Sequence, residues 1–457
     1  MQKLLEERQG DRGDFLPNFS IWLRDHVILA SLVILICSVA PRLFLTVTAD
    51  PQNLLRSDSY TYLTPALNLL EHGAFLNRHK EPEIDRTPGY PVFLMAIMSL
   101  VGKEVDGQDL QKILITQTLF LSWSVVIVYW LARRILPPVM AFTGSLLAAF
   151  SPWGAVWAGL CLTEGLYIFV LAAIFLLMKL VEETSQVSRA ILGIAVVGLL
   201  TGAAVLVRPL WPLVLLVAGA LVMQYGPRRK GVWILLTVMM ITATVPLILW
   251  KTRNVQEAHF HGLSNNGGKT TWRYLAARVT GQIEGRDQEI ISAEHVREES
   301  EWRLSTQEAD NERWRRAIGI FREYPVLTAY SFARSVVEHI LHPMPYGITT
   351  PAKLYLSGDY WVLAPLWVGY FLLWGGYLSL ACFGLWHASD GKGDNGTIDR
   401  GWLVTLLGIS LLLTLASGVS YGGGSRMRIS LELIIPLLAG VGLIRLLRSV
   451  PGLRVSS

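Results

Sequence analysis

Long apolar runs alternate with shorter polar segments along most of the chain. A helix rises 1.5 Å per residue, so about 20 mainly apolar residues are needed to cross the hydrocarbon core of a bilayer. On this criterion the pattern predicts ten membrane-spanning helices, at residues 27–47, 112–132, 139–158, 162–181, 189–207, 209–225, 231–250, 362–386, 401–419 and 429–447. The expected fold class is therefore an all-α polytopic membrane protein.

Two shorter patterns lie between the first two spans. Residues 90–101 form an apolar run that is too short for a full crossing, which favours an interfacial or re-entrant helix. Thr64, Pro65 and Gly73 suit the N-cap, the first position and the C-terminal end of a helix. We therefore expect a short helix from Thr64 to Gly73 on the membrane surface.

The distribution of basic residues sets the orientation of these spans. Arginine and lysine are concentrated in alternate short loops, such as 133–134 and 228–230, and loops rich in these residues face the cytoplasm. This places both termini in the cytoplasm, and a crossing by residues 90–101 would invert every later loop. The predicted parts are a module at 1–250 that includes the first outer loop 48–111, a large outer loop at 251–361, and the last three spans at 362–457. Helical spacing in residues 300–342 predicts that the large loop is mainly helical.

Composition agrees with a membrane protein and excludes several other classes. Of the 457 residues, 52% are apolar and 16% are charged, and the mean hydropathy is +0.41. The net charge of +5 comes from bases dispersed over the loops, which does not indicate nucleic-acid binding. No nucleotide-binding, serine-hydrolase or zinc-peptidase motif is present. The pairs His259/His261 and His339/His342 could hold a metal, but we expect them to be solvated loop histidines.

Charged residues that could form a site occur at the outer ends of the spans. They are Asp58, Arg86, Glu164, Arg208, Arg253, Arg426 and Arg428. A carboxylate such as Asp58 can accept a proton from a hydroxyl group, and arginines at helix ends can bind a phosphate through two hydrogen bonds. The sequence therefore suggests an outer-face site for an anionic ligand.

Structural explanations exist for five of these residues. Asp58 could cap a helix, and Glu164 could interact with a positive helix N-terminus. The long side chain of Arg208 could reach from the apolar span to the membrane–water interface. Arg426 and Arg428 follow three glycines, which could bring them to a ligand or mark a plain turn.

In their order along the chain, these motifs resemble the GT-C superfamily of integral-membrane glycosyltransferases. The similarity is to bacterial relatives of protein O-mannosyltransferases and lipid A aminoarabinose transferases. It is good over residues 27–254 and thin from 255 to 420. The residues that carry it are Asp58 with Tyr62, the RTPGYP motif at 86–91, Thr163–Glu164, Arg208–Pro209, Arg253–Asn254, and the Arg426/Arg428 turn.

The resemblance implies a fold and a set of residue roles. The first outer loop would hold two juxtamembrane helices, with residues 90–101 as the second. Asp58 would be the catalytic base and Glu164 a further catalytic acid. The phosphate of a polyprenyl-phosphate sugar donor would be bound by Arg208, Arg426, Arg428, Arg86 and Arg253, and Tyr60, Tyr62, Tyr90 and Asn254 would line the substrate pocket.

The expected activity is inverting transfer of a sugar to a hydroxyl on a lipid, glycan or protein, at the periplasmic face of a bacterial inner membrane. Many members of the superfamily have paired acids in the first loop, whereas Asp58 is followed by Ser59. A second carboxylate would have to be Glu164 or Asp85, so a divalent cation is an open expectation. The alternatives are a flippase or transporter of lipid-linked sugars and a structural membrane subunit. Transporters usually place their sites near the membrane midplane between matching halves, and no such halves are evident here.

Overall fold

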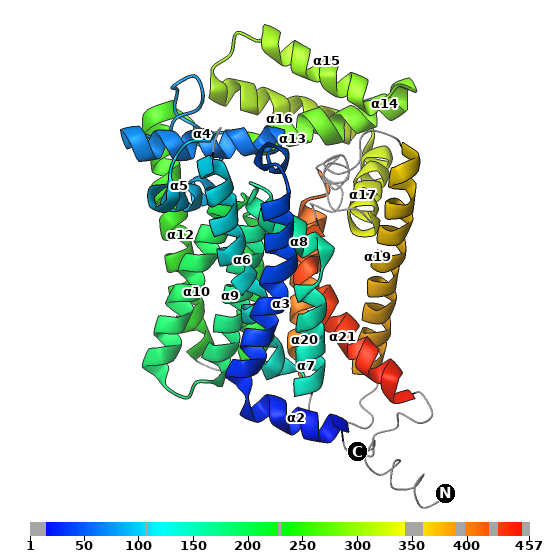
Figure 1. Ribbon diagram of the computed structural model, residues 1–457. Coiled ribbons are helices and arrows are strands. Elements are labelled where there is room, and N and C mark those ends of the chain that lie inside the picture. The colour runs from blue at the N-terminus through cyan, green and yellow to red at the C-terminus, as the bar shows by residue number, and fades with distance from the viewer. Residues whose placement is uncertain are drawn as a thin grey trace, which may run out of the picture.

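The computed structural model describes residues 15–105, 108–226, 231–342, 360–389, 398–419 and 428–449. Within these residues the regular secondary structure is helical, apart from a single isolated β-bridge between Leu76 and Pro82. Figure 1 shows a bundle of long helices with a layer of shorter helices across one end.

Each predicted span coincides with a helix or with a bent pair of helices. The bundle consists of α3 (Val27–Thr48), α6 (Gln108–Ile135), α7 (Pro138–Ala149), α8 (Pro152–Gly159), α9 (Thr163–Glu183), α10 (Val187–Val207), α11 (Pro212–Tyr225), α12 (Gly231–Ala258), α19 (Tyr360–Ser389), α20 (Arg400–Ala416) and α21 (Leu431–Ser449). Among the described residues, five helices are long and apolar enough to cross a membrane, or six if α7 and α8 form one span. The all-α membrane fold is confirmed, and the count of ten crossings stays a prediction.

The third predicted span is broken. Its two halves, α7 and α8, meet at an angle of 52°. The buried guanidinium of Arg42 on α3 donates hydrogen bonds to the carbonyls of Ala149 (2.8 Å) and Ala148 (3.4 Å) at the end of α7. Carbonyl groups freed at a helix end must be satisfied inside the membrane. Arg42 therefore stabilises the break.

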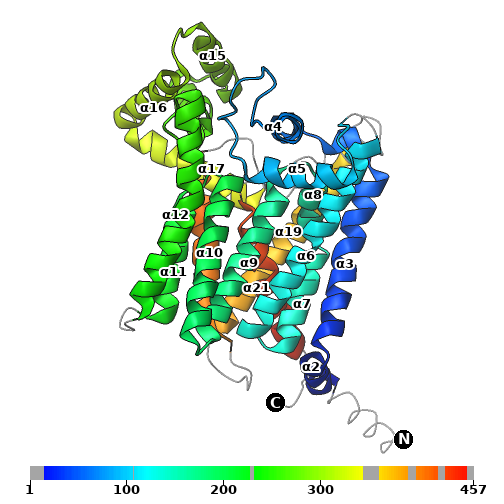
Figure 2. The same cartoon turned by 90° about the vertical axis from the view of Figure 1, so that its left-hand side faces the viewer.

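The first outer loop contains α4 (Ser57–His72) and α5 (Gly89–Val101), and both lie across the end of the bundle in Figures 1 and 2. An interfacial helix at 90–101 was expected, and α5 has this position. The predicted start at Thr64 is wrong, because α4 begins seven residues earlier and contains Pro65 in its interior. The Ser59 hydroxyl explains the earlier start, since it accepts the Arg56 N–H (2.9 Å) and donates to the Cys161 carbonyl (2.8 Å). Gly73 ends the helix in the left-handed conformation, as expected.

The second outer segment is mainly helical, as predicted. It contains α13 (Asn266–Thr270), the π-helical turn η2 (Thr271–Ala276), α14 (Ala277–Glu284), α15 (Gln288–Glu301), α16 (Thr306–Glu323) and α17 (Pro325–Leu341). In Figure 1, α14, α15 and α16 lie beyond α4 at the same end of the bundle. This end, with α4, α5 and α13–α16, is called the α4–α5 end below.

The opposite end of the bundle carries α2 (Phe15–Asp25) and the last turns of α6, α9 and α21 (Figure 2). Ion pairs connect the helices here. Lys179 binds Asp399 (2.8 Å) and Glu182 (2.9 Å), and Arg134 binds Glu183. The two ends of the bundle therefore have separate sets of charged residues.

Candidate functional site

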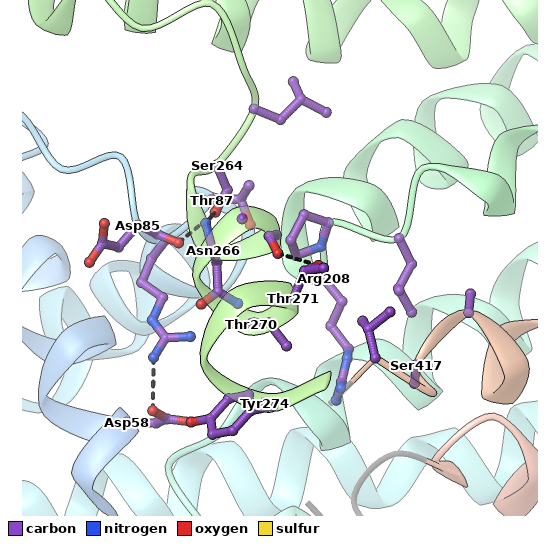
Figure 3. A pocket seen from close by; sticks show the side chains of 18 of the residues that line it. Asp58, Asp85, Thr87, Arg208, Ser264, Asn266, Thr270, Thr271, Tyr274 and Ser417 are labelled. Carbon is purple, nitrogen blue, oxygen red and sulfur yellow. Dashed lines mark hydrogen bonds and ion pairs between the residues drawn. The ribbon is translucent and has the colours of Figure 1, made fainter. Parts of the chain in front are cut away.

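A cavity of about 1130 Å³ opens at the α4–α5 end. Its walls come from the first outer loop, from the start of α9, from the junction of α10 and α11, from α13, η2, α15 and α16, and from the end of α20. Figure 3 shows Asp58 and Tyr274 on one side of this cavity and Arg208 and Ser417 on the other. Segments distant in sequence thus meet in one space.

Asp58 lies in the first turn of α4 and pairs with Arg86. One Asp58 oxygen accepts a hydrogen bond from the Arg86 guanidinium at 2.8 Å. Arg86 also donates to the hydroxyls of Thr61 (2.8 Å) and Tyr62 (3.2 Å) and stacks over the Tyr62 ring at 4.7 Å. The positive end of α4 favours the ionised carboxylate. Asp58 is 32% exposed, so it is held in place and still open to a ligand in the cavity.

The loop that presents Arg86 is fastened from two sides. The buried Glu83 carboxylate accepts the backbone N–H groups of Asp85 (2.5 Å) and Arg86 (3.1 Å). The Asp85 carboxylate binds Lys269 of α13 at 2.6 Å. Burial raises the pKa of Asp85, but the Lys269 ammonium outweighs this effect and holds the pKa below its usual value. Burial, followed by the Asp85 charge, raises the pKa of Glu83. The first outer loop is therefore bound to the second outer segment by charge.

Arg208 projects from the point where α10 ends. The backbone of Arg208 is extended (φ −134°, ψ 119°), as expected for a residue that precedes a proline. Its guanidinium donates to the fully buried Glu164 carboxylate at 2.7 Å and lies 5.8 Å from the Tyr167 ring. Arg208 lines the cavity, whereas Glu164 lies behind it. Glu164 therefore orients the guanidinium that faces the cavity.

Gly89, at the start of α5, brings the first loop against the end of α10. A Cβ atom added at Gly89 would lie 2.6 Å from the Leu206 carbonyl carbon and 2.6 Å from the Val207 nitrogen. Only glycine allows this approach of two backbones. The RTPGYP loop and the Arg208 junction are thereby fixed relative to each other.

The outer part of the cavity is both polar and aromatic. It is formed by residues of α13, η2, α15 and α16, among them Asn266, Thr270, Tyr274, Gln288, Ser292 and Trp314. The side nearest the bundle combines the charged Asp58, Arg86 and Arg208 with an apolar part formed by Leu210, Trp211, Ala416 and Val419. The cavity thus has charged and apolar parts toward the bundle and a mainly neutral, polar and aromatic side toward the outer helices.

Four of the predicted site residues meet in the cavity: Asp58, Tyr62, Arg86 and Arg208. Other predicted pocket residues do not line it. Tyr90 is buried and donates to Gln117 at 2.6 Å, and Tyr60 is exposed and donates to Gln52 at 3.3 Å. These two tyrosines support the first loop from outside the cavity.

Arg253 and Asn254 also lie outside the cavity lining. Arg253 donates to the carbonyls of Phe75 (2.5 Å) and Glu83 (2.7 Å), which fastens the first outer loop to α12. The buried Asn254 amide donates to the carbonyls of Gly262 (3.0 Å) and Leu263 (3.3 Å). Both side chains therefore bind backbone carbonyl groups of the outer loops, and neither lines the cavity.

Arg428 is fully buried between α17 and α21. It pairs with Glu432 (3.2 Å), lies 3.6 Å from the Trp374 ring centre, and donates to the carbonyls of Ile340 (3.0 Å) and His342 at the end of α17. The structure therefore does not bring Arg428 to the cavity. Arg426 lies outside the described residues.

The histidine expectation holds only in part. His259 and His261 are exposed, but His339 is buried on α17, so the prediction of a solvated loop is wrong for that residue.

The described residues do not assemble a metal site. In the described part of the chain, no group of three or more histidine, cysteine, aspartate and glutamate side chains could hold a metal ion. The carboxylates of Asp58 and Asp85 line the cavity, but each faces a basic side chain, Arg86 or Lys269. These carboxylates therefore act in ion pairs here, and no step proposed below is routed through a metal.

Sequence reasoning missed the outer side of the cavity. Tyr274 and Gln288 line it from a stretch with no readable sequence pattern, and Trp314 lines it from a stretch that shows only helical spacing. The contacts that bring them to Asp58 are tertiary, such as the Lys269–Asp85 pair, and leave no local signal.

Comparison with solved structures identifies the fold. The archaeal oligosaccharyltransferase AglB from Archaeoglobus fulgidus, in complex with an inhibitory peptide and a dolichol-phosphate, aligns with 93% of this chain at a TM-score of 0.52 and 11% identity. An Archaeoglobus fulgidus oligosaccharyltransferase tethered with an acceptor peptide aligns with 93% of this chain at a TM-score of 0.52 and 10% identity, and one in complex with zinc and sulfate aligns with 90% at 0.52 and 10% identity. This chain spans about half the length of AglB (51%). A weaker likeness, at a TM-score of 0.41 and 15% identity, is to ArnT from Cupriavidus metallidurans bound to undecaprenyl phosphate, covering 92% of this chain and 78% of ArnT.

The class that emerges is a multi-pass membrane protein with the GT-C fold, so the resemblance seen in the sequence is confirmed at the level of the fold. No protein-family model and no curated protein sequence matches the chain.

Proposed function

We propose that this protein is a membrane glycosyltransferase that moves a sugar from a polyprenyl-phosphate donor to a hydroxyl acceptor. The observation that carries the proposal is the cavity, in which a carboxylate, Asp58, and a guanidinium, Arg208, face one space at the end of a GT-C bundle. A bacterial inner membrane, with the α4–α5 end in the periplasm, would be the setting.

The donor phosphate would bind beside Arg208. The guanidinium is held by Glu164 at 2.7 Å, and α9 and α11 both begin at the cavity with Thr163 and Pro212. Helix N-termini and arginine both favour an anion. The apolar side of the cavity, with Leu210, Trp211 and Val419, would receive the first part of the lipid tail.

Asp58 would act as the base. It takes the proton of the acceptor hydroxyl, whose oxygen then attacks the anomeric carbon from the face opposite the phosphate. The bond from that carbon to the phosphate oxygen breaks, and the lipid phosphate leaves with both electrons and its charge stabilised by Arg208. Arg86 holds the Asp58 carboxylate in place through its 2.8 Å contact. A base in this position contributes about 10²–10⁴-fold to the rate.

The two roles can be separated experimentally. Binding of undecaprenyl phosphate is measured by native mass spectrometry, and transfer is measured with polyprenyl-phosphate donors that carry a panel of sugars. Arg208→Gln is expected to weaken binding about 10–100-fold, the value of one charge-assisted hydrogen bond. Asp58→Asn is expected to keep this binding and to lower transfer by at least about 10²-fold.

Arg133→Gln is the matched control for Arg208→Gln. Arg133 is exposed in the last turn of α6, at the end of the bundle opposite the cavity. Full transfer by Asp58→Asn would disprove the base assignment. Movement of a labelled lipid across liposomes without covalent change would support a transporter and contradict the proposal.

A further inference from the structure

Two large aromatic side chains are exposed on the outer side of the cavity. Tyr274 of η2 is 38% exposed and Trp314 of α16 is 40% exposed, and both line the cavity. They belong to the outer helices and not to the bundle, so contact with lipid does not account for them (Figure 1). Exposed aromatic groups beside a cavity are typical of a binding surface.

These aromatic groups are held by their surroundings. The Trp314 ring lies against the chain at Gly267 and Gly268, where an added Cβ would meet ring atoms at 3.5 and 3.2 Å. The Gln288 amide donates to the Tyr274 carbonyl (3.3 Å) and accepts from Arg278 (3.0 Å). Tyr274 also lies on a π-helical turn, a geometry often found at functional sites. The surface is therefore preorganised.

The polar groups on the outer side of the cavity are mostly neutral. Amide and hydroxyl side chains come from Asn266, Thr270, Gln288 and Ser292, and the acidic residue on this side is Glu289. Arg86 and Arg208, the arginines of the lining, belong to the bundle side. An anionic headgroup is therefore disfavoured at the outer side of the cavity.

This combination matches the chemistry of a sugar ring. A pyranose has faces made of C–H bonds, which stack on aromatic rings, and hydroxyl groups at its edge, which pair with amides and hydroxyls. A peptide acceptor is commonly bound by adding a strand to a sheet edge. The described residues offer no such edge, since their one β-bridge, Leu76–Pro82, is isolated. An acyl chain would need an apolar surface, and Leu210, Trp211, Ala416 and Val419 provide apolar side chains on the bundle side instead.

We propose that this outer wall, defined by Asn266, Thr270, Tyr274, Gln288, Ser292 and Trp314, is a carbohydrate-binding subsite that holds the acceptor. The inference rests on the proposed function and deepens it, because the acceptor hydroxyl is then a sugar hydroxyl. Trp314 and Tyr274 stack on the acceptor ring, and Asp58 receives its proton from the neighbouring hydroxyl.

The test uses the full chain in lipid nanodiscs, because sugar-headed detergents would compete. Saturation-transfer NMR is recorded with the methyl glycosides of glucose, mannose, galactose and N-acetylglucosamine, and with a short peptide and a lysophospholipid as other acceptor classes. At least one glycoside is expected to receive saturation on its ring protons. Trp314→Ala and Tyr274→Ala should each weaken its binding about tenfold, and Trp314→Phe should restore most of it.

Two controls separate this subsite from the rest of the site. Trp302→Ala removes a tryptophan of the same outer helices that stacks with Arg316 at 5.0 Å and does not line the cavity, so glycoside binding should persist. In Trp314→Ala, binding of undecaprenyl phosphate should stay within about twofold of wild type. Thermal unfolding shows that each variant is folded, and the two aromatic positions lie on different elements.

The outcomes are distinct. No binding of any glycoside, unchanged binding in both Trp314→Ala and Tyr274→Ala, or saturation of the peptide or lysophospholipid alone would each overturn the inference. Glycoside binding that depends on the two rings, in a protein without transfer activity, would leave the subsite standing while the proposed function fails. Transfer of a sugar to a peptide, without binding of any glycoside, would support the proposed function and contradict the carbohydrate subsite.

Discussion

The position of Arg208 can be predicted from the sequence, but the burial of its ion-pair partner, Glu164, cannot. The V-R-P sequence at 207–209 ends a helix at the membrane surface, and this local rule gives the position of Arg208. The sequence also singled out Glu164, but as a catalytic acid. The structure buries it completely against Arg208, because α9 and α10 pack side by side, a contact that no local pattern encodes.

Glu164→Ala is expected to lower the free energy of unfolding by about 3 kcal/mol, because the Arg208 guanidinium, whose side chain is only 12% exposed, would lose its counter-charge. The measurement is thermal or denaturant unfolding in nanodiscs. Glu183→Ala is the control, because its partner Arg134 is about one-third exposed and such pairs contribute less than about 1 kcal/mol. Equal losses in the two variants would contradict the role given to Glu164.

Asp310 gives a pH-dependent prediction. Burial raises its pKa to about 6, although Arg313 and Lys269 favour the carboxylate. A carboxyl group whose pKa is higher in the folded state than in the unfolded state contributes most below pH 4, and this stability is lost as the pH rises through 6. Asp310→Asn stays neutral, so at pH 8 it should be more stable than wild type by up to about 3 kcal/mol. Unfolding curves at pH 4 and pH 8 test this, and a gain of the same size at both pH values would count against it.

Arg428 shows where residue-level prediction fails. Three glycines before Arg426 and Arg428 suggested an open turn that could reach a ligand. Arg428 instead satisfies carbonyl groups at the end of α17, more than eighty residues earlier in the chain. A run of glycines indicates only that the backbone there can adopt many conformations. It does not show which distant helix end has carbonyl groups that require a hydrogen-bond donor.

At the scale of elements, the hydrophobic pattern located the bundle helices well, because apolar length is set by the membrane. Boundaries in the loop were less predictable. Pro65 suggested a helix start, yet α4 continues through it, since Ser59 links the true first turn to the Cys161 carbonyl. The break between α7 and α8 was also missed, because its stabilising donor, Arg42, comes from another helix.

Close packing of α10 on α12 depends on two small residues four positions apart, Gly198 and Gly202. A Cβ at Gly202 would lie 2.6 Å from the Pro246 ring and even closer to the α12 backbone. Helices pack closely in membranes through such small residues. Gly202→Ala should therefore lower stability by about 1–3 kcal/mol.

Gly219→Ala on α11 is the matched change, because nothing lies within 4 Å of an added Cβ there. It should be neutral or slightly stabilising, since alanine favours helix more than glycine. The same unfolding measurement compares the two variants, and an unchanged Gly202→Ala would show that α10 and α12 do not pack this closely.

At the scale of the whole molecule, charged groups divide between the two ends of the bundle. The cavity and its ion pairs occupy the α4–α5 end, and the Lys179–Asp399 and Arg134–Glu183 pairs occupy the other (Figure 2). The positive-inside pattern of the sequence predicts that the first of these ends faces the periplasm.

Cysteine labelling tests this orientation. In a background without Cys37, Cys161 and Cys382, Arg297→Cys on α15 should react with a membrane-impermeant maleimide added to intact spheroplasts. Arg189→Cys, in the first turn of α10, should react only after the membrane is permeabilised. The opposite pattern would place the cavity in the cytoplasm.

The contact at Gly89 has a mechanical consequence for how a lipid substrate arrives. Because the start of α5 touches the end of α10 there, the loop that presents Arg86 to Asp58 cannot move away from the segment bearing Arg208. For the proposed polyprenyl-phosphate donor, this favours lateral entry of the isoprenoid chain past Leu210, Trp211 and Ala416, whose apolar side chains border the cavity. Asp58 and Arg208 would then keep their distance from each other while the lipid chain enters the cavity.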